Sequence, residues 1–193
     1  MSKIRCDWCL GDKLYENYHD KEWGVPVFDD RLLFKSLILE TFQAGLSWIT
    51  VLRKREHFKK AFDNFDYRKI ASYNIQKEDE LMSNPSIIRN RQKIESTIKN
   101  AKYFMKIQKS KGSFSNYIWD FVSGNPILND YKKSNEIPTY TSLSKSISKD
   151  LKQNGFKFIG PTVVYSYMQA IGIVNDHLVD CFRYSKASLN LKR

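Results

Sequence analysis

Cysteine, glycine and proline are scarce in the sequence, and it contains no long apolar run. Three cysteines (Cys6, Cys9 and Cys181) are too few, and odd in number, for the disulfide framework of a small secreted domain. Eight glycines and five prolines exclude a collagen-like or linker-like chain. The longest uncharged run, residues 158–175, includes Gly, Pro and polar residues, whereas a membrane span needs about 20 mostly apolar ones. Because residues 1–5 begin no secretory apolar segment, we expect a cytoplasmic protein that contacts no membrane.

The chain does contain enough apolar material for a core, together with a large excess of positive charge. Its 193 residues are 41% hydrophobic and 14% aromatic, which excludes a disordered tail or a coiled-coil rod and predicts a single domain over residues 1–193. Lys and Arg number 32 against 21 Asp and Glu, giving a net charge of +11. This excess indicates a polyanionic partner, most commonly nucleic acid, although solubility in a lysine-rich proteome would also explain it.

The spacing of apolar residues is helical almost throughout. Ile94, Ile98, Ala101 and Met105, for example, recur as one stripe of a long amphipathic helix. No sustained alternation of period two occurs, so we predict an all-α fold with few or no strands, and a connection between two helical lobes in residues 124–138. The other expected helices begin after Asp29 and after Ser47 and cover residues 66–73, 77–82, 114–122, 142–153 and 161–172.

Two cysteines and two histidines near the chain ends suggest a metal site. Cys6 and His19 lie near the N-terminus, and His177 and Cys181, four residues apart, would share one face of a helix. Two sulfurs and two imidazoles suit tetrahedral Zn²⁺, and four protein ligands leave no position for a reacting water, so the metal would join the termini structurally. Buried thiols with two ordinary histidines are the alternative, and Cys9 could compete as a ligand.

An acid among aromatic residues is a second candidate site. Glu40 lies in the apolar segment 37–42, where a buried carboxylate is costly unless it meets hydrogen-bond donors. It could accept hydrogen bonds from a bound base while aromatic rings stack on that base, and a positively charged base would gain cation–π attraction. Alternatively, the tryptophans belong to the core and Glu40 pairs with a surface cation. The aromatic candidates are Trp8, Tyr18, Trp23 and Trp48.

Residues 151–172 read as helix, tight turn and helix. Gly160 precedes a helix whose backbone N–H groups favour a phosphate, and Lys157 adds positive charge, but a plain helical hairpin would look the same. Of the basic residues between 89 and 111, most are expected to be solvated. Arg89 and Arg91, beside the start of a helix, are the better candidates for contacts with a phosphate backbone.

Seven motifs in order along the chain resemble those of the bacterial DNA-3-methyladenine glycosylase I (Tag) family. The resemblance extends from about Arg5 to Cys181, almost the whole chain. Two of the strings have six or more residues, so chance is a poor explanation. The motifs are Arg5-Cys6-Asp7-Trp8, Tyr18-His19-Asp20, Glu22-Trp23-Gly24-Val25-Pro26, residues 43–52 (QAGLSWITVL), Ile87-Ile88-Arg89, residues 155–160 (GFKFIG) and Val174-Asn175-Asp176-His177.

The resemblance implies an all-helical helix-hairpin-helix glycosylase fold whose termini are joined by a zinc clip. It implies zinc ligands at Cys6, His19, His177 and Cys181, and a base pocket at Glu40, Tyr18, Trp8, Trp23 and Trp48. It also implies that the hairpin turn, with Lys157, Gly160 and Thr162, binds the DNA backbone. The Gly45-Leu46 corner would enter the gap left by a flipped nucleotide, for which an apolar wedge is suited.

The activity implied is excision of 3-methyladenine from alkylated double-stranded DNA by a monomer, with the free base as product. Many members of the wider superfamily that are also lyases carry a lysine where Thr162 stands, and an aspartate where Asn175 stands. Schiff-base chemistry is therefore not expected, and the usual catalytic carboxylate is missing. Glu40, the candidate catalytic residue, would bind the base. Action as general acid or base is the less favoured alternative, because the leaving base requires no protonation. The alternatives are a non-catalytic, zinc-stabilised helical DNA-binding module and a bifunctional glycosylase-lyase.

The sequence departs from the family pattern in two places, at Cys9 and at Thr41-Phe42. Cys9 creates an additional C-x-x-C, which leaves the choice of N-terminal thiolate open, and Thr41-Phe42 replaces a smaller or polar pair expected after the pocket acid.

Overall fold

The computed structural model describes residues 3–184, so residues 1–2 and 185–193 of the predicted domain lie outside the described part. Helices dominate this part, which confirms the all-α prediction. The elements are η1 (Asp7–Cys9), α1 (Lys13–Lys21), α2 (Asp30–Gln43), α3 (Trp48–Ala61), η2 (Asp63–Phe65), α4 (Tyr67–Ile70), α5 (Ile75–Ser83), α6 (Arg91–Lys111), α7 (Phe114–Asp120), β1 (Ile127–Leu128), η3 (Ser134–Glu136), α8 (Ser142–Gln153), α9 (Pro161–Ala170) and β2 (Val174–Asn175).

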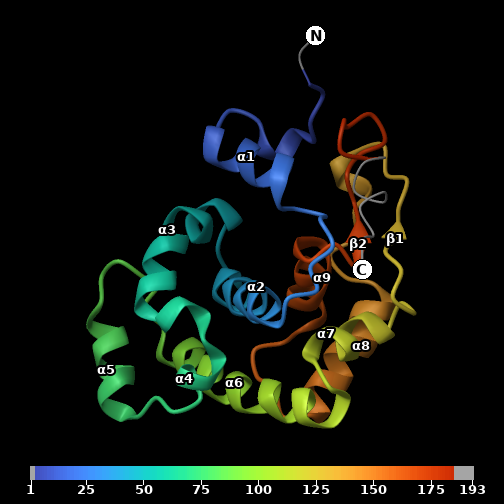
Figure 1. Cartoon of the computed structure of the whole chain (residues 1–193). Coiled ribbons are helices and arrows are strands. Elements are labelled where there is room, and N and C mark those ends of the chain that lie inside the picture. Colours follow the sequence, from blue (N-terminus) through green and yellow to red (C-terminus); the bar gives the residue numbers. More distant parts are fainter. Residues whose placement is uncertain (1–2, 185–193) are drawn as a thin grey trace.

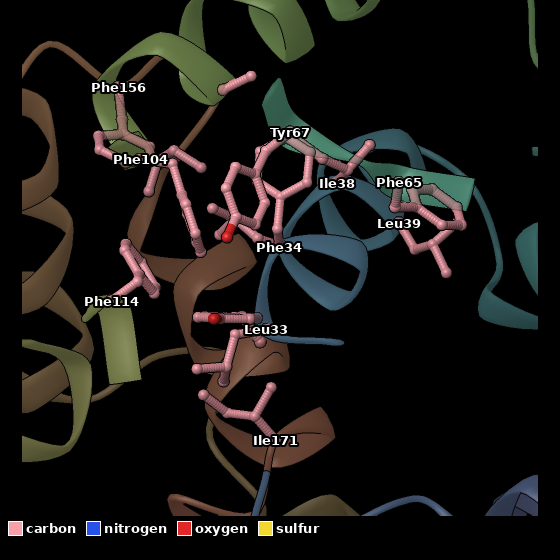
Figure 2. Close-up of a cluster of buried hydrophobic side chains, with 14 of the residues drawn as sticks. Leu33, Phe34, Ile38, Leu39, Phe65, Tyr67, Phe104, Phe114, Phe156 and Ile171 are labelled. Carbon is pink, nitrogen blue, oxygen red and sulfur yellow. The ribbon is translucent and has the colours of Figure 1, made fainter. Parts of the chain in front are cut away.

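The core is built around α2 and α9, which pack against each other at the centre of the molecule (Figure 1). Leu33, Phe34 and Ile38 of α2 are fully buried, and Ile171 lies beside them just after α9 (Figure 2). Burial of such side chains contributes about 1.5–3 kcal/mol each. Both helices are therefore fixed by packing, which matters because both also line the pocket described below.

The long helix α6 runs along one side of this core and contacts α2, α4 and α7. Its buried stripe includes Ile94, Ile98 and Ala101 as predicted, but the next member is Phe104, not Met105, which is 37% exposed. Phe104 stacks on Phe114 of α7 with ring centroids 4.1 Å apart. The prediction for Met105 was wrong because a helix of 3.6 residues per turn brings both i+10 and i+11 near one face, and the aromatic partner selects Phe104.

Capping residues define most helix starts. Asp29 and Asp66 accept backbone N–H groups of α2 and α4 as expected. Ser47 is the N-cap of α3, yet its hydroxyl hydrogen-bonds Thr50 Oγ1 at 2.8 Å instead of the helix backbone. Residues 13–21 form a helix that was not predicted, and Asp12 caps this helix, α1, by accepting from two backbone N–H groups.

The hairpin of α8 and α9 closes tightly against α6. Gly155 has a φ of +95°, and a Cβ there would lie 2.3 Å from the ring of Tyr103. Only glycine fits both the left-handed backbone and this close approach. The Ser148 hydroxyl donates to the carbonyl of Ile159 at 2.6 Å, which fixes the end of the turn against α8.

Regular strand structure in residues 3–184 is limited to β1 and β2, which pair in parallel with Ile127 opposite Val174. This pairing joins the predicted connecting stretch to the segment after α9. Among the described helices, none is long and apolar enough to cross a bilayer.

Candidate active site

A cavity of about 310 Å³ lies between the N-terminal segment, α2, α3 and α9. Its wall contains all five residues that the sequence singled out as a base pocket: Trp8, Tyr18, Trp23, Glu40 and Trp48. The volume is at the lower end of the range for small-molecule sites. The remaining lining residues are Tyr15, Gln43, Ser134, Ile137, Ser166 and Gln169.

Glu40 is the acid of this cavity. It lies in the last turn and a half of α2 and is only 3% exposed, because the apolar residues around it pack into the core. Its Oε2 has no hydrogen-bond partner among the described residues. Burial raises the pKa of Glu40 to about 8, so its carboxyl is mostly protonated at neutral pH. A buried polar group without a partner is costly, and a ligand that supplies hydrogen bonds would remove that cost.

The aromatic rings enclose the space in front of this acid. Trp8 lies edge-on to Trp23 with centroids 4.9 Å apart, and Tyr18 is tilted against Trp48 at 5.2 Å. The indole N–H of Trp48 is also buried without a partner in the described part of the chain. The wall thus offers one unsatisfied acceptor and one unsatisfied donor between flat rings. This chemistry suits a planar heterocycle with polar edges.

Cys6, His19, His177 and Cys181 form a buried cluster whose four ligand atoms all lie within 4.8 Å of one another. The distance from His19 Nε2 to His177 Nδ1 is 3.2 Å, and Cys181 Sγ lies 3.4 Å from the first and 3.6 Å from the second. Tetrahedral Zn²⁺ with ordinary bond lengths sets about 3.3 Å between two nitrogens and about 3.5 Å between nitrogen and sulfur. The four side chains therefore fit a tetrahedral metal ion.

The surroundings of the histidines orient them toward a metal. His19 Nδ1 lies 3.0 Å from a carboxylate oxygen of Asp20, and His177 Nε2 lies 3.2 Å from the carbonyl of Trp23. Since these oxygens only accept, each of these nitrogens carries its ring proton. The two remaining nitrogens, His19 Nε2 and His177 Nδ1, then carry no ring proton and lie 3.2 Å apart, so both can bind a cation. The backbone N–H of Cys6 contacts His19 Nε2 at 3.4 Å. Arg5 in turn holds Asp20 through two hydrogen bonds of 2.9 Å.

The two thiols of the cluster form a coupled pair. The hydrogen bond from Cys6 holds the pKa of Cys181 well below its usual range, whereas this same hydrogen bond, together with burial, raises the pKa of Cys6. Cys9 lies outside the four-residue cluster, and its thiol donates to the carbonyl of Cys6 at 3.1 Å. Burial raises the pKa of Cys9 to about 12, which disfavours a competing thiolate.

His177 and Cys181 are not on a helix, contrary to the expectation from their spacing. They follow β2 in irregular backbone and a turn, closed by a 2.8 Å bond from the N–H of Cys181 to the carbonyl of Leu178. The turn still directs both side chains to the same point. Gly24 makes room for this arrangement, because a Cβ at that residue would lie 3.1 Å from His177 Nε2.

The corner between α2 and α3 borders the pocket. Gln43 and Trp48, which precede and follow it, both line the cavity. Within the corner, Gly45 adopts a left-handed φ of +81° and Leu46 is 42% exposed. An exposed leucine thus stands at the rim of an aromatic pocket.

The hairpin turn and Arg89 lie on other parts of the surface and do not line the cavity. Lys157, Thr162 and Arg89 are exposed, and Gly160 is the N-cap of α9. Ser166 of α9 lines the pocket one turn after Thr162, so the start of this helix is close to the cavity. Arg91 donates to Asp79 at 2.7 Å, and its contact with a phosphate backbone stays a prediction.

Comparisons with known proteins agree on one family. A family model described as Methyladenine glycosylase matches residues 8–184. The DNA-3-methyladenine glycosylase of Haemophilus influenzae is 49% identical over 177 residues, which cover 92% of this chain and 96% of that protein. DNA-3-methyladenine glycosylase 1 of Escherichia coli is 46% identical over 180 residues, or 93% and 96% of the two chains. The chain belongs to the methyladenine glycosylase family.

Solved structures of the methyladenine glycosylase family have the same fold. A crystal structure of 3-methyladenine DNA glycosylase I (TAG) superimposes with a TM-score of 0.90 at 46% identity, covering 93% of this chain and 98% of that one. A structure of the Staphylococcus aureus enzyme, described as the basis of its 3-methyladenine recognition, gives 0.90 at 40% identity, covering 93% and 96%. The resemblance inferred from the motifs is confirmed.

This member of the methyladenine glycosylase family has no free carboxylate where lyases of the superfamily carry their aspartate. Asn175 donates to the carbonyl of Tyr184 and accepts from the N–H of His177. Asp176 is fully buried and accepts hydrogen bonds of 2.6–2.7 Å from Asn129, Tyr165 and Gln169. Neither residue lines the pocket.

Four of the residues that line the pocket were not predicted from the sequence. Ser166 and Gln169 come from α9, and Ser134 and Ile137 come from the segment that was predicted to be irregular. Ser166 and Gln169 are three residues apart and share a face of α9, which is the signal that could have identified them.

Proposed function

We propose that this chain is a monofunctional DNA glycosylase that hydrolyses the N-glycosidic bond of flipped-out 3-methyladenine in alkylated double-stranded DNA. The observation that carries the proposal is a buried, unpartnered Glu40 carboxyl among aromatic rings, beside a corner with an exposed Leu46. Two curated relatives that cover almost the whole chain are named for this activity. A solved TAG variant is described as a complex with 3-methyladenine.

Glu40 recognises the base through a hydrogen bond. Its carboxyl accepts a hydrogen bond from the exocyclic amine edge of adenine, which a flipped base presents to the pocket wall. Tyr18, Trp8, Trp23 and Trp48 stack around the base, and their π faces favour the positive charge that methylation at N3 confers. Normal adenine lacks this charge, so charge and pocket shape together discriminate against it.

The substrate supplies most of the driving force for bond cleavage. A base methylated at N3 is cationic and leaves as a neutral molecule, so the leaving group needs no protonation. This suits a site in which neither Asp176, which accepts from three donors, nor Asn175, which is bonded to the backbone, lines the pocket. Extruding the nucleotide costs a few kcal/mol, less for a damaged base. Thr162 stands at the position of the lyase lysine, and no lysine is among the described residues that line the cavity, so Schiff-base chemistry is not expected.

DNA is bound by the rim of the pocket and by the hairpin. Leu46 directly follows Gly45, whose backbone is in the left-handed region, and its side chain fills the gap left by the flipped nucleotide. The backbone N–H groups at the start of α9, with Gly160 as N-cap and Thr162 in the first turn, bind a phosphate. Lys157 and Arg89 add exposed positive charge. The enzyme acts as a monomer in the cytoplasm and releases free 3-methyladenine.

Zn²⁺ is the metal best suited to the cysteine–histidine cluster. It would be held by Cys6 and Cys181 through sulfur, by His19 through Nε2 and by His177 through Nδ1. With four protein ligands the ion supplies no catalytic water and serves to join the two ends of the chain.

The deciding experiment is incubation of the purified protein with methylated duplex DNA, followed by chromatography of the released bases and a strand-nicking assay. Free 3-methyladenine without nicks is expected. Duplex binding without release would favour the non-catalytic DNA-binding module, and nicking would favour the lyase. In a second arm, Glu40→Gln should reduce single-turnover release more than duplex affinity. An equal loss of both would contradict the base-reading role of Glu40.

A further inference from the structure

Lys93 is a buried cation on α6 that holds the corner between α2 and α3. It is 5% exposed, and its Nζ donates to the carbonyls of Phe42 at 2.9 Å and Ala44 at 2.6 Å. These carbonyls belong to the end of α2, where the helix leaves acceptors unsatisfied and its dipole favours positive charge. The ammonium therefore fixes the backbone immediately before Gly45 and Leu46.

Asn100 holds the hairpin turn from the same helix. It is fully buried; its Oδ1 accepts from the N–H of Lys157 at 2.8 Å, and its Nδ2 donates to the carbonyl of the same residue at 3.0 Å. The next residue, Phe158, has a left-handed φ of +57°, which is unfavourable for a bulky side chain and needs support from its surroundings. Asn100 supplies that support through both backbone groups of Lys157.

Asn100 lies seven positions after Lys93, so the two residues lie on one side of α6, two turns and about 10 Å apart. We propose that they are positioning residues that set the spacing between the Gly45-Leu46 corner and the Lys157 turn, so that both contact the same duplex. This inference rests on the proposed function, which assigns these two loops to DNA. Neither Lys93 nor Asn100 lines the base pocket.

Thr97 offers a matched control on the same stretch of helix. It is also fully buried and polar, but its hydroxyl donates to the carbonyl of Lys93 within α6 at 2.8 Å and reaches no loop. Replacing it by valine changes buried polarity without touching either loop. If the three residues served stability alone, their replacement should affect DNA binding alike. If Lys93 and Asn100 position the two loops, replacement of Thr97 should leave DNA binding unchanged.

The test compares Lys93→Met, Asn100→Leu and Thr97→Val with the unaltered protein. Two affinities are measured: for a duplex with an abasic analogue and for free 3-methyladenine. We expect the Lys93 and Asn100 variants to bind the duplex about tenfold more weakly or worse, because small misplacements of contact groups are costly, and to bind the free base unchanged. Thr97→Val should match the unaltered protein in both. A single-stranded oligonucleotide, which needs no fixed loop spacing, should be affected less than the duplex.

Unchanged duplex affinity in a folded Lys93 or Asn100 variant would overturn the proposal. So would a parallel loss of duplex and free-base affinity, or an equal effect of Thr97→Val, since each indicates general destabilisation. If one variant does not fold, the other decides. Failure of the unaltered protein to release base from methylated DNA would instead count against the proposed function, and the abasic-duplex comparison would still test the spacing.

Discussion

Replacing Glu40 by Gln should stabilise the folded protein, and the gain should grow as the pH rises. The carboxyl is buried without a partner, and burial raises its pKa from 4.5 to about 8. Below the unfolded value both states hold the proton, so the pH has no effect through this group. Between the two values the unfolded chain ionises while the native protein stays protonated, so stability is lost as the pH rises. Gln has no proton to lose and escapes this penalty.

The size of the effect follows from the pKa. Each unit corresponds to about 1.4 kcal/mol, so the shift makes the penalty about 5 kcal/mol once the pH exceeds 8. The difference in free energy of unfolding between Glu40→Gln and the unaltered protein should therefore rise by about 1.4 kcal/mol per pH unit from about pH 5 to about pH 8 and then level off. For a chain of this size the full difference corresponds to roughly 10–20 °C in Tm.

Chemical denaturation at a series of pH values measures this difference directly. Any change in metal binding with pH would affect both proteins and cancel in the comparison. Glu56→Gln is the control, because this side chain is 70% exposed and its replacement removes no buried acid. A difference between Glu40→Gln and the unaltered protein that stays constant from about pH 5 to about pH 9 would refute the reasoning, since it would mean that Glu40 titrates alike in both states.

Two further predictions concern the metal and the corner. Chelation of the metal, or Cys181→Ser, should lower the Tm, whereas Cys9→Ser should leave metal content unchanged because its thiol lies outside the cluster; an unaltered Tm after complete metal removal would disprove the structural role. Leu46→Ala should weaken binding to a duplex with an abasic analogue, because it removes an exposed apolar side chain at the pocket rim. Equal affinity of both proteins in a titration would eliminate Leu46 as the wedge.

The fold class was predictable because long helices with an apolar stripe and a cap carry a strong local pattern. The hairpin helix over residues 142–153 has the predicted bounds, and α9 begins at Pro161 as expected. Short α1 was not predicted, since few of its residues are apolar and its cap, Asp12, is one of many acidic residues in the chain. Met105 illustrates a different limit of sequence-based prediction. The spacing of apolar residues allowed either Phe104 or Met105 to face the core, and stacking on Phe114 buries Phe104.

The candidate site was predictable where a residue type was unusual for its surroundings. Glu40 is an acidic residue within an apolar segment, and two distant Cys–His pairs offer the ligand types that zinc prefers. What sequence spacing did not reveal is the route by which distant segments meet. His177 and Cys181 converge through a turn rather than a helix, and Ser134 reaches the pocket from a stretch without periodicity. Such placements depend on tertiary contacts, not on local preference.

The metal cluster and the pocket share their walls, which connects stability to base binding. Tyr18 and His19 are neighbours on α1, and since successive residues of a helix point about 100° apart, one faces the pocket and the other the metal. Trp23 lines the pocket with its ring, while its carbonyl lies 3.2 Å from His177 Nε2. The ring of Trp8 lies 5.4 Å from that of His19. Three of the four aromatic walls of the pocket, Tyr18, Trp23 and Trp8, thus adjoin residues of the cysteine–histidine cluster.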